Sequence, residues 1–194
     1  MSWTGVVLAG GRSQRFGGVD KTRLPLGGRT LLQRAVDTLA PVTAACVVIG
    51  SGAPVTGATV VPDRYPGAGP LGGLLTALDA IDSSHALILA ADLPFISGSL
   101  LRDVQRAGAD AAAAVVQHPD GRLALCLSVR RDCAPAVHEM WSRGARRMRD
   151  LENLVPCRKV VADAATAAGA LWNVNVPLTY ARALELTEHD CPAC

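Results

Sequence analysis

The feature that most limits the fold of this 194-residue chain is a series of short apolar runs, each ending at a turn. Such runs cover residues 4–9, 44–49, 58–61 and 86–91. Between them, apolar residues recur at helical spacing over residues 30–39 and 71–81, and Thr30 is a suitable N-cap for the first of these helices. Strand-sized runs that alternate with helices predict an α/β fold, in which parallel strands are joined by right-handed crossovers.

The composition indicates that the strands are covered on both faces. Hydrophobic residues make up 49% of the chain and aromatic residues only 4%, and the runs are rich in Val, Ala, Leu and Ile. Such runs are typical of a parallel sheet buried between two layers of helices. The length fits one domain. We therefore predict a single-domain, three-layer α/β/α fold with a Rossmann-like, mostly parallel sheet.

The second half of the chain departs from simple alternation. Two apolar runs, residues 110–116 and 123–129, flank His118-Pro119-Asp120-Gly121, which predicts a hairpin turn. We expect a helix capped by Ser97 or Ser99 before this hairpin. The remaining elements we expect are helices over residues 132–141 and 145–154, a strand over 157–161 and a last helix from Pro177.

Charge and hydropathy exclude some partners. Lys and Arg number 19 and Asp and Glu number 17, so a net charge of +2 gives no general reason to bind nucleic acid or an anionic membrane. No apolar run reaches the roughly 18 residues that span a bilayer. The first residues lack the pattern of a signal peptide, and the cysteines are typical of reduced thiols. We expect a cytoplasmic protein that binds neither nucleic acid nor a membrane.

The clearest local signal is the glycine-rich segment of residues 8–21. Glycines after a strand allow backbone N–H groups to face an anion, and Arg15 and Lys21 add two cations that suit a polyphosphate. Two familiar phosphate loops do not match. Arg12 stands where a dinucleotide fingerprint needs its second glycine, and Asp20 stands where a Walker loop needs a glycine before the lysine. A flexible surface turn is the alternative.

The segment resembles a known family. Its pattern L-A-G-G-x-S-x-R-x-G-x-x-x-K is similar to the signature loop of nucleotidyltransferases that join an NTP to a phosphorylated acceptor, and residues 17–21 resemble the molybdenum cofactor guanylyltransferases. Three later segments resemble that family's motifs in the expected order: Asp63 with the turn at 69–73, Asp92-Leu93-Pro94, and residues 173–177. Together these motifs cover roughly residues 5–180.

The resemblance implies a fold and a reaction. The fold would be the glycosyltransferase-A-like topology of nucleotidyltransferases, over a single domain of residues 1–188, with a nucleotide-binding half of about 1–108 and an acceptor-binding half of about 109–188. Residues 189–194 would be a flexible tail. The reaction would be Mg²⁺-dependent transfer of GMP from GTP to the terminal phosphate of molybdopterin, with release of pyrophosphate. Molybdenum cofactor insertion proteins or molybdoenzymes would be transient partners.

The resemblance also implies site residues. Arg15, Lys21 and Asp92 would be catalytic. The nucleotide would contact Leu8, Ala9, Gly10, Gly11, Lys21, Asp63, Gly69, Pro70, Leu71 and Asp92. Independently of the resemblance, Asp92 follows an apolar strand, at the sheet edge where α/β folds bind ligands, and a carboxylate there suits Mg²⁺. A turn or N-cap role is the alternative for Asp92.

The acceptor side is less defined. By resemblance, Asn173 and Asn175 would bind the acceptor, and Asn175 would orient the metal or the acceptor phosphate, although Val176 replaces the family's Thr. Arg146 and Arg147, near one face of the expected 145–154 helix, are candidates for an anionic acceptor, and a solvated helix face is equally consistent with them. The pair Cys191 and Cys194 ends the chain either as a metal or disulfide clip or, as we expect, in a frayed tail.

Other functions stay open. Within the same class, the chain would use CTP on molybdopterin, or an NTP on a small phosphorylated metabolite. Ser51 follows Gly50 where the family often has an Asn that helps to read guanine, so the base is not fixed. A nucleotide-binding regulatory protein without activity is an alternative of a different class, and a redox or metal-storage protein is a third.

Overall fold

One mixed sheet carries the fold. The computed structural model describes residues 1–10, 16–50 and 54–189, and within these ranges seven strands form a sheet in the order β5-β4-β1-β6-β8-β7-β9. The strands are β1 (Trp3–Leu8), β4 (Ala45–Ile49), β5 (Thr59–Val61), β6 (His85–Ala90), β7 (Ala113–Gln117), β8 (Leu123–Arg130) and β9 (Cys157–Val161). The predicted apolar runs are therefore strands.

The strand directions confirm a mostly parallel sheet. Strand β1 pairs in parallel with β4 and β6, and β7 pairs in parallel with β9, whereas β8 runs antiparallel to both of its neighbours. The reversal of β8 comes from the predicted hairpin turn, which is closed by the bond from His118 N–H to the Arg122 carbonyl at 2.7 Å. Gly121 adopts φ +88° in this turn, a backbone conformation that favours glycine.

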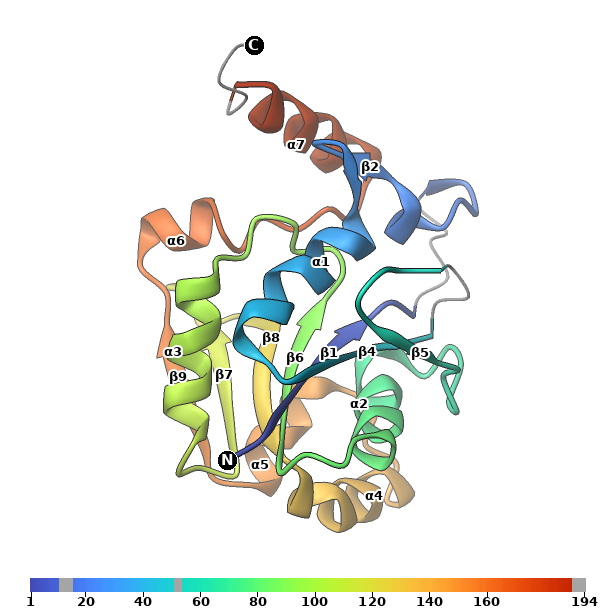
Figure 1. The fold of residues 1–194 in the computed structure, drawn as a ribbon. Helices are drawn as coiled ribbons and strands as arrows, with labels where there is room; N and C mark the ends of the chain where they lie inside the picture. Colours follow the sequence, from blue (N-terminus) through green and yellow to red (C-terminus); the bar gives the residue numbers. More distant parts are fainter. Residues whose placement is uncertain (11–15, 51–53, 190–194) are drawn as a thin grey trace.

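Helices cover both faces of the sheet, as predicted. Helices α1 (Leu31–Leu39) and α3 (Gly98–Gly108) lie on one face, and α2 (Gly69–Ala80), α4 (Ala134–Ser142) and α5 (Leu151–Leu154) lie on the other (Figure 1). The predicted caps are present, since Thr30 Oγ1 accepts from Gln33 N–H and Ser97 Oγ accepts from Leu100 N–H. The fold is a three-layer α/β/α sandwich.

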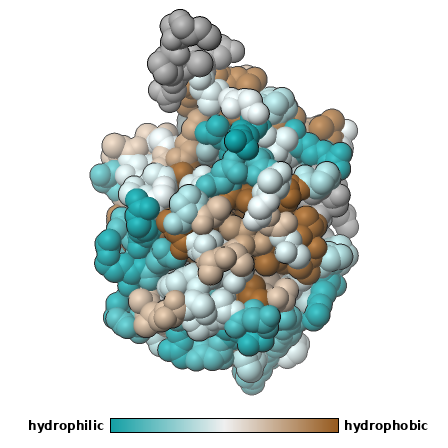
Figure 2. Space-filling view, viewed as in Figure 1, coloured by the Kyte–Doolittle hydropathy of each residue, from teal (hydrophilic) through white to brown (hydrophobic). Residues whose placement is uncertain are grey.

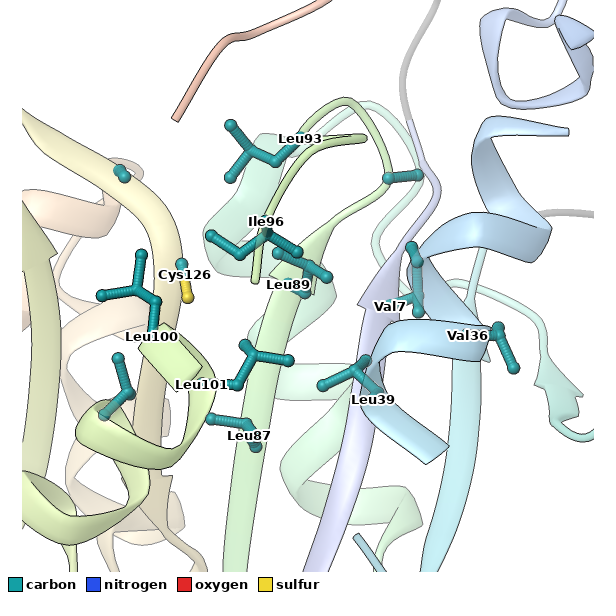
Figure 3. Close-up of a cluster of buried hydrophobic side chains, with 14 of the residues drawn as sticks. Val7, Val36, Leu39, Leu87, Leu89, Leu93, Ile96, Leu100, Leu101 and Cys126 are labelled. Atoms are coloured by element: carbon teal, nitrogen blue, oxygen red, sulfur yellow. The ribbon is translucent and has the colours of Figure 1, made fainter. Parts of the chain in front are cut away.

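The face under α1 and α3 shows how the layers join. Figure 3 shows Val7, Leu87 and Leu89 of the sheet packed against Leu39 of α1 and Leu101 of α3, all fully or almost fully buried. Cys126 lies in the same cluster, and burial raises the pKa of its thiol to about 12. A thiol with such a pKa is protonated at neutral pH, which agrees with the expected structural role of this cysteine.

The expected helix over residues 145–154 is wrong as a single element. Helix α4 stops at Ser142, and Gly144 reverses the backbone with φ +95°. The chain then forms only a short 3-10 turn, η5 (Met148–Asp150), followed by α5. A glycine in the left-handed region is a common helix stop.

A small layer lies above the carboxyl ends of the strands. It contains the turn η2 (Lys21–Arg23), the hairpin of β2 (Pro25–Leu26) and β3 (Arg29–Thr30), and the last helix α7 (Pro177–His189) (Figure 1). A separate apolar cluster that includes Leu26, Val174 and Ala183 joins the hairpin to α7. Two further 3-10 turns and one short helix complete the described elements: η3 (Ala40–Val42), η4 (Arg131–Cys133) and α6 (Ala164–Ala168).

The surface is mixed in character. On the face that carries α1 and α3, apolar residues gather near the middle and hydrophilic residues surround them (Figure 2). Across the described ranges, no helix is both long and apolar enough to span a bilayer. The cytoplasmic location and the division at residue 108 stay predictions. The Cys191 and Cys194 pair and most of the expected tail lie outside the described residues.

The contact between α3 and β8 generates a stability prediction. A Cβ on Gly108 would lie 2.0 Å from Ser128 Oγ, and Ser128 is 1% exposed. We expect Gly108→Ala to lower the free energy of unfolding by about 1–3 kcal/mol, because the buried serine has little room to move. Gly98→Ala is the control on the same helix, since its Cβ would meet only Arg102 Nη1 at 3.6 Å. Equal stability of the two variants in urea unfolding would contradict the packing described.

Candidate active site

A pocket of about 260 Å³ opens at the carboxyl ends of β1 and β6. Its wall is built from the end of β1, the turn η2, the start of α2 and the segment after β6. The lining residues are Leu8, Ala9, Gly10, Lys21, Thr22, Ile49, Asp63, Gly67, Gly69, Pro70, Gly73, Ala90, Ala91, Asp92 and Leu125. Ligands of open α/β sheets bind at this edge.

Lys21 is held in place by its own turn. Asp20 caps η2, because its Oδ1 accepts from Thr22 N–H at 3.0 Å and from Thr22 Oγ1 at 2.7 Å. Thr22 is buried, so the turn is anchored on the protein side. Lys21 is thereby directed into the pocket from a rigid base.

Two lining residues, Lys21 and Asp92, form a polar cluster with Asn175, which lies beside the pocket. Lys21 Nζ lies 2.6 Å from Asp92 Oδ2 and 2.9 Å from Asn175 Oδ1. The side chains of Lys21 and Asp92 are only 20% and 14% exposed. A charge-assisted bond in a partly buried site is stronger than one on the surface. The cluster joins three segments that are far apart in the sequence.

The second oxygen of Asp92 suits a cation. Asp92 Oδ1 is buried, and in the described part of the chain no group donates a hydrogen bond to it. A buried carboxylate oxygen without a partner is costly unless a ligand satisfies it. One carboxylate and the nearby Asn175 amide oxygen are hard donors of the kind that Mg²⁺ takes, with water and substrate phosphates completing its shell. The residues present therefore fit this ion.

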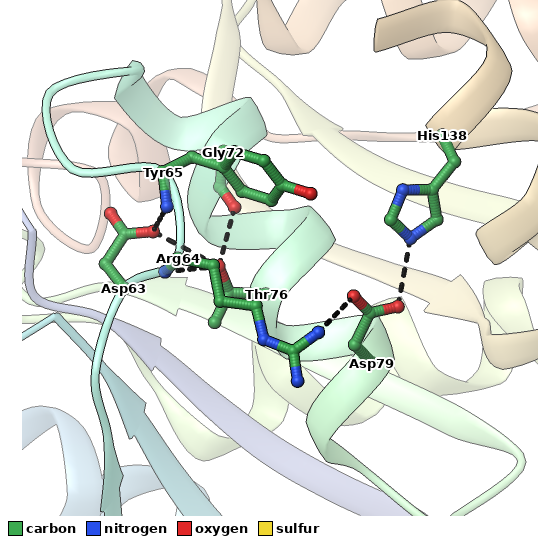
Figure 4. Close-up of polar contacts among 7 residues, drawn as sticks. All are labelled: Asp63, Arg64, Tyr65, Gly72, Thr76, Asp79 and His138. Carbon is green, nitrogen blue, oxygen red and sulfur yellow. Dashed lines mark hydrogen bonds and ion pairs between the residues drawn. The ribbon is translucent and has the colours of Figure 1, made fainter. Parts of the chain in front are cut away.

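Asp63 is fixed by hydrogen bonds from α2 and its own loop (Figure 4). Its Oδ1 accepts from Tyr65 N–H at 2.9 Å and from Thr76 Oγ1 at 3.1 Å. Its Oδ2 lies 3.4 Å from the position that a Cβ on Gly10 would occupy, so this oxygen faces the end of β1. Asp63 Oδ1 thus holds the side chain in place, and Asp63 Oδ2 lies toward Gly10 at the pocket.

The floor of the pocket depends on two glycines. Gly50 has φ +93°, and a Cβ there would lie 3.0 Å from the Gly10 Cα atom. Ala9 N–H donates to the Ile49 carbonyl at 2.9 Å. Because that donor is already used within the fold, a contact between Ala9 and a nucleotide would use its carbonyl oxygen or side chain.

Most of the residues predicted to bind a nucleotide are gathered on this pocket. They are Leu8, Ala9, Gly10, Lys21, Asp63, Gly69, Pro70 and Asp92. Leu71 does not line the pocket, because its side chain is fully buried in the core under α2. Gly11 and Arg15 lie outside the described residues, so their predicted roles stay predictions.

A larger cavity of about 690 Å³ lies between the β7–β8 hairpin and the segment that leads to α7. Asn173, Trp172 and Thr179 line it, together with apolar residues such as Leu93 and Leu171. Leu125 lines both the cavity and the pocket. The two spaces therefore meet along one strand.

The arginines predicted to bind an acceptor lie elsewhere. Arg146 and Arg147 line neither of these two spaces. The Arg146 guanidinium lies 4.0 Å from the centre of the Trp141 ring and donates to the carbonyls of Trp141 and Ala145. Because residues 145–147 are not helical and the next turn begins at Met148, the two arginines do not share the helix face on which the prediction depended.

Some residues of the site were not predicted from the sequence. Thr22 and Leu125 line the pocket, and Thr76 holds Asp63. The Asp20–Thr22 spacing is a local capping signal that would have indicated Thr22. Leu125 is one apolar residue among many on β8, and nothing in its sequence context marks it.

Comparisons with known proteins agree on one family. The MobA-like NTP transferase domain matches residues 5–157. The molybdenum cofactor guanylyltransferase of Xanthomonas euvesicatoria is 33% identical over 93% of this chain and 93% of its own length. A protein of Chloroflexus aggregans named "probable molybdenum cofactor guanylyltransferase" is 37% identical over 76% of this chain and 75% of its own length.

Solved structures share the fold at low identity. Molybdopterin-guanine dinucleotide biosynthesis protein A of Archaeoglobus fulgidus matches with a TM-score of 0.76 and 19% identity, over 96% of this chain and 99% of its own. The 2-C-methyl-D-erythritol 4-phosphate cytidylyltransferase of Thermus thermophilus matches with a TM-score of 0.72 and 20% identity, over 94% and 98%. These likenesses confirm the predicted nucleotidyltransferase topology.

The close approach of Gly50 to Gly10 generates a prediction. We expect Gly50→Ala to weaken nucleotide binding by about tenfold or more, because the new methyl group strains a positive-φ site and pushes on the pocket floor. Gly57→Ala is the matched control, since Gly57 has φ +82° but its Cβ would meet only Val36 Cγ1 at 3.9 Å. Both variants should lose stability, and calorimetry should find weaker binding only for the first. Equal nucleotide affinities would contradict this account.

Proposed function

The chain belongs to the MobA-like NTP transferase family and is a nucleotidyltransferase, and from this premise we propose that it transfers GMP from GTP to the terminal phosphate of molybdopterin. The products would be the guanine dinucleotide form of the cofactor and pyrophosphate. The observation that carries the proposal is the contact of Lys21 with Asp92, both on the pocket wall, and with Asn175 beside it. The names of the relatives support the choice of substrates.

The reaction is a displacement at phosphorus. An oxygen of the acceptor phosphate forms a bond to the α-phosphorus of GTP, and the bond from that phosphorus to the bridging oxygen of the leaving pyrophosphate breaks. Negative charge grows on the leaving group, so catalysis depends on positioned cations more than on a protein nucleophile. Lys21 supplies such a charge at a fixed position, because two oxygens hold its ammonium group.

Asp92 and Asn175 would hold the metal. Mg²⁺ bound there would neutralise phosphate charge and order the reacting oxygens. Asp92 is suited to that role because its Oδ1 is buried and accepts no hydrogen bond from any residue in the described ranges. Its peptide carbonyl is fixed by the bond from Val174 N–H at 2.9 Å. Asp63 and the end of β1 would bind the nucleoside portion at the other end of the pocket.

The acceptor would occupy the larger cavity. Its apolar wall suits a flat ring system, and its rim carries Asn173 and His118. The shared residue Leu125 lets the two substrates approach each other beside Asp92, which lines the pocket, and Leu93, which lines the cavity. This placement replaces Arg146 and Arg147 as the expected acceptor contacts.

Two other functions are distinguished by experiment. A transferase that uses CTP on molybdopterin, or an NTP on a small phosphorylated metabolite, would share the same polar cluster. A regulatory protein that only binds nucleotide would not need Lys21, Asp92 and Asn175 in contact. The cluster therefore favours an enzyme over a binding protein.

A substrate panel tests the proposed reaction directly. We expect pyrophosphate release from GTP in the presence of molybdopterin and Mg²⁺, with little release from ATP, UTP or CTP. Omission of the acceptor is the control for simple hydrolysis. Release from CTP without release from GTP would establish the cytidylyl alternative, and release from no nucleotide would reject the proposed function.

The role of Lys21 can be tested with a matched control, because the chain contains one other lysine, Lys159. We expect Lys21→Ala to lower kcat by about 100-fold or more, since a positioned charge at the leaving group is lost. Lys21→Arg should not restore activity, because a planar guanidinium does not fit between oxygens that lie 2.6 and 2.9 Å from one ammonium nitrogen. These rates come from the pyrophosphate assay.

The second lysine provides the control for this series. Lys159 pairs with Glu152 at 3.4 Å on the surface, and Lys159→Ala should retain wild-type turnover. If Lys21→Ala retained turnover within about threefold of the wild type, the assignment of Lys21 would be wrong.

A further inference from the structure

The start of helix α7 is held by one hydroxyl group. Thr179 Oγ1 accepts from Asn175 N–H at 3.1 Å and from Val176 N–H at 3.2 Å, and it donates to the Val176 carbonyl at 2.9 Å. A threonine hydroxyl has one donor and two acceptor positions, so these three contacts use its full capacity. The hydroxyl therefore fixes the backbone on both sides of the Asn175–Val176 peptide bond.

This arrangement replaces an ordinary helix cap. Val176 immediately precedes Pro177, the first residue of α7, and a valine side chain cannot accept a hydrogen bond from the helix N-terminus. Thr179 stands three residues further on, the position from which a capping-box side chain reaches back to the N-cap amide. Thr179 therefore makes one of the two hydrogen bonds of a capping box, the one to the Val176 amide, and the valine cannot make the other.

The fixed backbone carries a residue of the polar cluster. The Asn175 side chain leaves the chain at this point and accepts from Lys21 Nζ at 2.9 Å. Thr179 itself lines the larger cavity, not the pocket, and its carbonyl accepts from Trp172 Nε1 at 3.2 Å. The turn is thus tied to α7 on one side and to Trp172 on the other (Figure 1 shows α7 above the strand ends).

We propose that Thr179 is a positioning residue for the transfer reaction: its hydroxyl sets the orientation of Asn175 and, through it, the position of the Lys21 ammonium group. Thr179 does not touch the reacting atoms in this role. The proposal rests on the proposed function only for its kinetic consequence, because the hydrogen bonds exist in the protein alone.

Thr179→Val tests the proposal, since it removes the hydroxyl at nearly constant shape. We expect kcat to fall roughly tenfold while the KM for GTP changes less than about twofold, because the end of the pocket near Asp63 is untouched. Thr179→Ser, which keeps the hydroxyl, should restore kcat to within about threefold of the wild type. A general loss of folding would not be rescued selectively in this way.

Two further arms separate positioning from structural damage. Thr187→Val is the control on the same helix, because the Thr187 hydroxyl donates to the helix carbonyls of Ala183 and Leu184, and it should leave kcat unchanged. Adding Thr179→Val to Asn175→Ala should lower kcat no further than Asn175→Ala alone, since both changes act through one contact. Additive effects would overturn the proposal.

Hydrogen exchange provides a measurement without substrate. Amides of Asn175 and Val176 should exchange about tenfold faster in Thr179→Val than in the wild type, and at the wild-type rate in Thr187→Val. Unchanged exchange in Thr179→Val would overturn the proposal even if the enzyme used other substrates. Faster exchange in Thr179→Val, together with a wild type that is inactive with GTP and molybdopterin, would reject the proposed function and leave the positioning role supported.

Discussion

The site depends on one interaction, the contact of the Lys21 ammonium group with the oxygens of Asp92 and Asn175 at 2.6 and 2.9 Å. Each partner is fixed by a different part of the fold. Lys21 is held by the capped turn η2, Asp92 follows the buried strand β6, and Asn175 precedes α7. The contact therefore forms only when the sheet, the turn η2 and the start of α7 have their correct relative positions. A partly buried ammonium beside a carboxylate is stable only when these anchors are rigid.

The single reversed strand explains why two spaces meet beside this cluster. Strand β8 runs antiparallel between β6 and β7, and Leu125 near its start borders both the pocket and the larger cavity. A parallel strand at this place would begin at the opposite edge of the sheet. The hairpin turn at Gly121 thus brings the second half of the chain to the carboxyl ends of β1 and β6, where the pocket opens. Such an arrangement suits a reaction that joins two substrates.

Short sequence patterns correctly predicted the structures that depend on neighbouring residues. The apolar runs, the caps at Thr30 and Ser97 and the hairpin turn were all confirmed, because each depends on a few neighbouring residues. The expected 145–154 helix failed over residues 145–147 because the Asp150 carboxylate accepts from Arg147 N–H at 3.1 Å, a capping contact that starts the turn at Met148 instead. The contact between Lys21 and Asn175 has no local signal, since the two residues are 154 positions apart. Resemblance, not periodicity, brought them into one hypothesis.

That separation has a consequence for how the protein is made. At a typical synthesis rate of 5–20 residues per second, Asn175 is added roughly 8–30 s after Lys21. Strands β1, β4, β5 and β6 are synthesised within that interval or before it, whereas the amide that holds the lysine is added 154 positions after it. The contact of Lys21 with Asn175 therefore requires a segment that is made after the strands around the pocket. Its formation is a separate step of assembly, which follows the synthesis of residue 175.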